Sequence, residues 1–112
     1  MKKDRVYLEY ILERIGRIEE DVASGRKSFM NSHTIQDAVL RNLQTLAESC
    51  QRLSEPFKQN HPDVEWKKLS AFRNVLVHDY LGIDLDQIWI IVVRDVPELK
   101  IKIEQLIDKL PE

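Results

Sequence analysis

Apolar residues recur at three- and four-residue steps along most of this chain, and this spacing limits its fold more than any other feature. One face of an α-helix repeats every 3.6 residues, so the spacing predicts amphipathic helices rather than strands. The first helix is expected from about Asp4 to Ala23, and its stripe is Leu8, Ile11, Leu12, Ile15, Ile18 and Val22. The segment Ser24-Gly25-Arg26-Lys27-Ser28 is expected to end it.

A second helix is predicted to reach about Ser54, and its stripe is Ile35, Val39, Leu43, Leu46, Cys50 and Leu53. Asn31 or Ser32 is expected to cap it, because either side chain accepts a hydrogen bond from the free amides of a first turn. Pro56 and Pro62 bracket the following connection, which has room for one short helical turn.

A third helix is predicted from about Val64 to Leu81, with Asp63 as its cap and Gly82 as a left-handed terminator. The last segment begins at Asp84 and carries Ile88, Trp89, Val92, Val93, Val96, Leu99, Ile103, Leu106 and Leu110. Pro97 should kink or split it, since proline lacks an amide donor. The short run IWIIVV within it is also compatible with a strand.

Four amphipathic helices with short connections predict an all-α protein: an antiparallel four-helix bundle with an additional short helix and a kinked or split C-terminal helix. The 112 residues are expected to form a single helical domain, residues 1–112. A composition that is 43% hydrophobic is rich enough for a core and excludes the disordered class.

No apolar run approaches the ~20 residues of a membrane span. The first ten residues, MKKDRVYLEY, have Asp4, Arg5 and Glu9 where a signal peptide needs an unbroken apolar stretch. These features predict a soluble, cytoplasmic chain without a membrane partner. The formal net charge is -2, whereas proteins that coat nucleic acid carry a basic excess. Any contact with RNA must therefore be local, and DNA is not an expected partner.

Cys50 is the single cysteine, which excludes an intrachain disulfide and a thiolate zinc site. It lies in the apolar stripe of the second predicted helix, so we expect a buried, unreactive thiol. Neither an HExxH motif nor a clustered carboxylate–histidine set is present in the sequence, and no cofactor is expected.

The segment from Trp66 to Gly82 is the most informative stretch. Its core stripe is Leu69, Phe72 and Leu76. Asn74 and His78 lie one turn apart on the opposite side, where a surface helix usually carries Lys and Glu. Apolar residues border this pair, namely Val75, Val77 and Leu81. Such a border indicates that the second face is also covered, and a twofold dimer is the simplest cover.

His78 is expected in the last helical turn, where the helix dipole favours the imidazolium form and Asp79 adds to the effect. A histidine that switches between base and acid suits proton transfer at a ribose hydroxyl. Arg73 lies about 140° away around the helix, and its long side chain is expected to clamp a phosphate. Lys67 and Lys68 add local positive charge. By periodicity alone, Tyr80 falls near the core side, so packing is its default role.

Taken together, Arg73, His78 and Tyr80 form the string R-x4-H-x-Y, and the chain resembles HepT-like proteins of the wider HEPN superfamily. Asn74 after the arginine, Trp66 before the motif and the stretch from Gly82 to Trp89 strengthen the resemblance. It extends to Arg41-Asn42-Leu43 and Asp95-Val96-Pro97-Glu98-Leu99. One departure is Ala47-Glu48-Ser49, where a Gly-Glu-Ala-like stretch is expected, which leaves details of helix packing open.

The resemblance implies a metal-independent endoribonuclease that acts as the toxin of a toxin–antitoxin pair. Its partners would be an RNA substrate and a minimal nucleotidyltransferase antitoxin that silences it by adenylylating Tyr80. On this reading His78 is the acid/base, Arg73 the phosphate ligand and Asn74 an orienting residue. Tyr80 is then a modification target as well as a substrate contact.

Two other functions stay open at this point, because a fold does not fix a function. The chain could be a non-catalytic helical subunit that binds and positions a nucleotidyltransferase, or it could be the antitoxin rather than the toxin.

Overall fold

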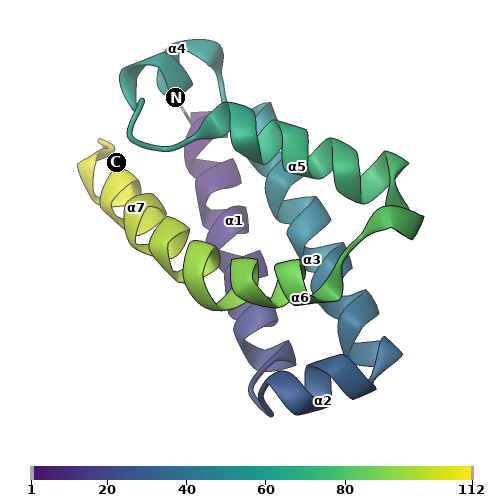
Figure 1. Ribbon diagram of the computed structural model, residues 1–112. Coiled ribbons are helices and arrows are strands. Elements are labelled where there is room, and N and C mark those ends of the chain that lie inside the picture. Colours follow the sequence, from purple (N-terminus) through teal and green to yellow (C-terminus); the bar gives the residue numbers. More distant parts are fainter. Residues whose placement is uncertain (1, 112) are drawn as a thin grey trace.

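The computed structural model describes residues 2–111, and every regular element in that range is helical (Figure 1). The all-α prediction is confirmed. The α-helices are α1 (Lys2–Asp21), α2 (Arg26–Asn31), α3 (His33–Arg52), α4 (Glu55–Asn60), α5 (Trp66–His78), α6 (Leu85–Ile90) and α7 (Val96–Lys109). A 3-10 turn, η1 (Tyr80–Gly82), follows α5, and a π-helical turn, η2 (Ile91–Asp95), joins α6 to α7.

The long helices α1 and α3 lie side by side at the centre, with α5 against α3 and α7 against α1 (Figure 1). Neighbours in this bundle are antiparallel, as predicted. Asp4 at the start of α1 accepts hydrogen bonds of 2.8 Å from both the amide and the hydroxyl of Ser54, just beyond α3. At the opposite end of α1, Asp21 accepts one of 3.0 Å from Asn42 of α3.

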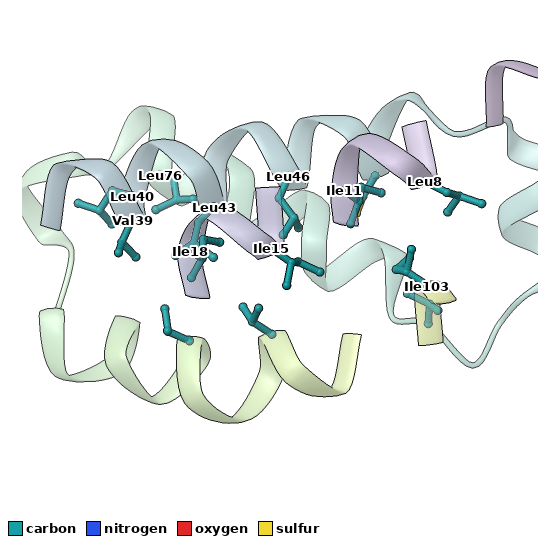
Figure 2. Packing of buried hydrophobic residues seen from close by; sticks show 14 of the residues in the cluster. Leu8, Ile11, Ile15, Ile18, Val39, Leu40, Leu43, Leu46, Leu76 and Ile103 are labelled. Carbon is teal, nitrogen blue, oxygen red and sulfur yellow. The ribbon is translucent and has the colours of Figure 1, made fainter. Parts of the chain in front are cut away.

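The apolar stripes that were expected from the spacing form one continuous core (Figure 2). Side chains of α1 and α3 meet along most of their length, and α5 and α7 each contribute from one side. Figure 2 labels Leu8, Ile11, Ile15 and Ile18 of α1, Val39, Leu40, Leu43 and Leu46 of α3, Leu76 of α5 and Ile103 of α7. Burial of these side chains is the main force that stabilises the bundle.

The start of α3 was predicted correctly. The Ser32 hydroxyl accepts a hydrogen bond of 3.2 Å from the amide of Ile35, so Ser32 rather than Asn31 is the cap. The segment from Ser24 to Ser28 was expected to end the first helix, but it also contains the start of α2. Gly25, with φ of 91°, ends the turn, and α2 begins directly after it at Arg26. The short helix in the proline-bracketed connection is α4, which Ser54 caps through the amide of Phe57.

Both predicted ends of α5 were wrong. The helix begins at Trp66, not Val64, because a turn closed by the Val64 amide on the His61 carbonyl precedes it, and Asp63 is therefore not its cap. It ends at His78, not Leu81, because the amide of Gly82 bonds the Asp79 carbonyl at 3.0 Å and tightens the chain into η1.

Gly82 is thus not a left-handed terminator; within residues 2–111 a positive φ occurs only at Gly25. A Cβ atom at position 82 would lie 2.7 Å from one carboxylate oxygen of Asp79. That oxygen ends an exposed, flexible side chain that can turn aside, so the 3-10 turn does not require glycine at this position.

The expected disturbance near Pro97 takes the form of the π-helical turn. The Val96 amide bonds the Ile91 carbonyl, five residues back, so the helix widens just before the residue that lacks a donor. The run IWIIVV is helical, and the polypeptide stays helical from Leu85 to Lys109. Within the described range, no helix combines the length and apolar character needed to cross a membrane.

Candidate active site

The exposed face of α5 carries most of the residues that were singled out from the sequence. Lys67, Asn74 and His78 are exposed and follow one another at helical steps, with the small Ala71 between them. Lys68 lies beside this face and pairs with Glu65 at 2.8 Å, which raises the pKa of its ammonium group. The free charge on the stripe therefore comes from Lys67.

Apolar side chains border this polar stripe and are open to solvent. Val75 is 44% exposed, and Leu81 in η1 is 102% exposed. Exposed large apolar side chains that gather beside a polar site are typical of contact surfaces. Two of the three border residues predicted from the sequence thus lie uncovered in a single chain.

Arg73 points away from this stripe toward α3. Its guanidinium donates at 3.2 Å to the Glu48 carboxylate and at 3.3 Å to the side-chain oxygen of Asn74. The side chains of Arg73 and Glu48 are 27% and 29% exposed, so the pair is partly shielded from water. Nε of Arg73 is buried without a hydrogen-bond partner among the described residues. Asn74 therefore links the arginine to the exposed face.

Tyr80 does not pack in the core, which corrects its default role. The side chain is 54% exposed, because η1 replaces the final helical turn on which the expectation was based. Its hydroxyl donates at 3.2 Å to a carboxylate oxygen of Asp37 in α3. This hydrogen bond is the main cause of the raised pKa of Tyr80. A shallow hollow of about 180 Å³ lies here, lined by Asp37, Leu40, Arg41, Gln44, Leu76 and Tyr80.

The sequence-predicted residues thus form two groups in one chain. Arg73 is hydrogen-bonded to Asn74, one turn before His78 on α5, whereas Tyr80 lies against α3. Sequence reasoning missed Glu48 and Asp37, the two α3 carboxylates that hold Arg73 and Tyr80. The sequence offered a signal only for Glu48, which is the one residue of Ala47-Glu48-Ser49 that keeps the expected Gly-Glu-Ala-like pattern.

A larger cleft of about 480 Å³ opens between α5 and the C-terminal helix and has an apolar floor. Its charged rim includes Glu65, Lys68, Arg94 and Lys102. Lys67, Asn74 and His78 of the exposed stripe do not line this cleft.

Cys50 is buried as predicted, and desolvation raises the pKa of its thiol to about 12. Among residues 2–111, no group of three or more His, Cys, Asp or Glu side chains is arranged to hold a metal ion.

Two comparisons, with protein families and with known protein sequences, place the chain among known proteins. The family described as "HepT-like: Ribonuclease HepT-like" matches residues 11–106. A Thermococcus cleftensis protein named "Probable ribonuclease HepT" is 36% identical over 101 residues, which cover 89% of this chain and 92% of that protein. A Caldanaerobacter subterraneus protein named "Putative RNase" is 29% identical over 110 residues, which cover 97% of this chain and 98% of that protein.

A Methanocaldococcus jannaschii protein named "Gamma-glutamylcyclotransferase and putative RNase" is 34% identical over 112 residues, and the chain spans only 50% of its length. No solved structure matches. The family match extends from the middle of α1 to the last turns of α7 and includes the whole exposed stripe of α5. The chain therefore belongs to the HepT-like ribonuclease family.

Proposed function

We propose that this protein is a metal-independent endoribonuclease toxin, that Arg73 and His78 are its catalytic residues, and that adenylylation of Tyr80 by a cognate minimal nucleotidyltransferase silences it. Family membership supports the ribonuclease activity. The observation that carries the site assignment is the exposed α5 stripe, where His78 stands one turn from the Arg73–Asn74 pair beside uncovered apolar residues.

A homodimer explains why one chain holds so few of the groups that the reaction needs. The exposed Val75 and Leu81 are suited to a self-complementary contact across a twofold axis. Such a contact brings two copies of His78 and two of Arg73 into one cleft. The Lys67 ammonium on the same stripe attracts the RNA backbone, whereas the chain as a whole, with a net charge of -2, does not.

The chemistry follows from these groups. One His78 takes the proton of the ribose 2′-hydroxyl, and the resulting oxygen attacks the adjacent phosphorus. The other His78 gives a proton to the departing 5′-oxygen, so the products are a 2′,3′-cyclic phosphate and a 5′-hydroxyl. Arg73 donates paired hydrogen bonds to the phosphate oxygens, whose charge grows in the transition state, and Asn74 holds its guanidinium in place.

Silencing through Tyr80 is compatible with its position. A half-exposed tyrosine on a short 3-10 turn is accessible to a second enzyme. Tyr80 follows His78 by two positions in the sequence. The added nucleotide would bring a negative phosphate and a bulky base to this end of α5, where both would obstruct RNA.

The test is a His78→Ala variant, with His33→Ala as the matched control because His33 is an exposed histidine at the start of α3. We expect the His78 variant to fold and dimerise like the wild type and to lose toxicity in cells, while the control stays toxic. A folded His78→Ala protein that still arrests growth would refute the catalytic assignment.

A non-catalytic subunit that positions a nucleotidyltransferase is the second candidate, and one contact favours it. Arg73 is already engaged by Glu48, which reduces its availability for a phosphate. Cleavage of RNA by the purified protein, abolished in Arg73→Ala without weaker partner binding, would decide for the enzyme. Expressing each gene of the pair alone tests the remaining reading, in which this chain is the antitoxin: only the toxin gene should arrest growth.

A further inference from the structure

The contact between Tyr80 and α3 differs from the other polar contacts near the site. The Tyr80 hydroxyl donates to Asp37 at 3.2 Å, although neither residue is buried and 43 positions separate them. The hollow around this pair is open to solvent and includes Arg41, one turn along α3 from Asp37. A phenol, a carboxylate and a guanidinium thus surround one small concave surface.

We propose that Asp37 is the general base for nucleotidyl transfer to Tyr80, so that the target chain itself supplies a catalytic residue for its own modification. The inference rests on the proposed function, in which Tyr80 is the modified residue. It adds that the acceptor is activated from within this chain, and that the transferring enzyme needs to bring only the nucleoside triphosphate and its phosphate-binding groups.

The step balances as follows. The Tyr80 Oη attacks the α-phosphorus of a nucleoside triphosphate, the bond from that phosphorus to the bridging oxygen breaks, and pyrophosphate leaves. The phenolic proton passes to the Asp37 carboxylate, with which it already forms a hydrogen bond. A phenol near neutral pH is protonated, and the same hydrogen bond keeps it so by raising the pKa of Tyr80. Removal of the proton during attack is therefore the step that needs a base.

Arg41 makes the local charge suitable for this reaction. A carboxylate alone would repel a triphosphate, and the guanidinium that lines the same hollow offsets this repulsion. None of the ion pairs among the described residues includes Arg41, so its charge is available for the α-phosphate or for the phosphodiester that results. If Asp37 only tethered η1 to α3, no cation would be needed beside it. The presence of both a base and a cation next to the Tyr80 hydroxyl therefore favours a catalytic role for Asp37.

The experiment measures AMP transfer from ATP to Tyr80 by intact mass, with the purified nucleotidyltransferase partner and varied concentrations of this chain. The key variant is Asp37→Asn, whose amide oxygen still accepts the Tyr80 hydrogen bond but is not basic. Asp37→Ala removes the tether as well, and Asp108→Asn, an exposed aspartate near the end of α7, is the matched control. Circular dichroism establishes that each variant is folded.

We expect kcat for transfer to fall about 10²-fold or more in Asp37→Asn, the usual contribution of a general base, with KM little changed and Asp108→Asn like the wild type. Transfer to Asp37→Asn at the wild-type rate would overturn the proposal. A loss confined to Asp37→Ala would also overturn it, since Asp37 would then be a tether, and so would an effect on KM alone. If the wild type itself gains no AMP, the proposed silencing of Tyr80 fails first, and that result is distinct from these three.

Discussion

The contact between Arg73 and Glu48 gives the most quantitative prediction. Replacing Glu48 by Ala removes the carboxylate that holds the arginine at 3.2 Å and leaves a partly buried guanidinium whose Nε already has no partner. Arg73→Ala removes the other half of the pair. The double variant completes a thermodynamic cycle, and the cycle isolates the coupling energy between the two side chains.

The magnitude follows from the burial of the pair. Exposed ion pairs contribute about 0.2–1 kcal/mol, and breaking a fully buried pair costs about 3–5 kcal/mol. Side chains that are 27% and 29% exposed lie between these limits. We therefore expect a coupling energy of about 1–2 kcal/mol and a destabilisation of about 2 kcal/mol for Glu48→Ala. At about 5 °C per kcal/mol, the Tm of Glu48→Ala should fall by about 10 °C.

Urea unfolding followed by circular dichroism provides the assay. One fixed protein concentration is used, because the proposed dimerisation would make apparent stability depend on concentration. The measurement is repeated in 1 M salt, which weakens exposed pairs more than shielded ones. A coupling energy below about 0.3 kcal/mol at low salt, the usual error of additivity, would refute the argument that Glu48 holds Arg73 in place.

Three further outcomes are expected. Asp4→Ala should lower the free energy of unfolding by about 2–3 kcal/mol, because the amide and the hydroxyl of Ser54 lose the buried carboxylate that accepts their hydrogen bonds. Urea unfolding measures this loss. Cys50 should react with a maleimide in the folded protein far more slowly than in urea, because its thiol, with a pKa of about 12, is almost wholly protonated at pH 8 and is buried. In an ultraviolet titration against Tyr80→Phe, Tyr80 should ionise above pH 10, and Asp37→Ala should shift that ionisation toward 10, because it removes the acceptor that stabilises the protonated phenol. An unchanged Tyr80 titration in the Ala variant would show that the contact does not form in solution.

Periodicity was sufficient to predict the bundle, since the stripes of the first two predicted helices are the core of α1 and α3. It was insufficient at the ends of α5. Asp63 and Gly82 are residues that favour a cap and a terminator, but the actual ends depend on local turns closed by the carbonyls of His61 and Asp79. Because a helix end depends on such local hydrogen bonds, propensity alone does not fix the terminal residue.

The site was predictable only in part, for a related reason. Residues on one helix face follow from spacing, which is why Asn74 and His78 were placed correctly on the exposed side of α5. Contacts between helices depend on their relative rotation and register, which a single sequence does not contain. Asp37 and Glu48 look like ordinary surface acids of α3, and only the packing of α5 against α3 shows that one holds Tyr80 and the other Arg73. Tyr80 was expected near the core for a different reason, because the prediction continued α5 through it, whereas the helix ends at His78 and η1 follows.

The most direct test of the central claim is cleavage of a labelled RNA by the purified, unmodified protein in the presence of EDTA, with analysis of the product ends. We predict fragments that end in a 2′,3′-cyclic phosphate and a 5′-hydroxyl, formed by the wild type and by His33→Ala but not by folded His78→Ala. Cleavage that persists in His78→Ala, or that stops when EDTA is added, would contradict a metal-independent ribonuclease site built on Arg73 and His78.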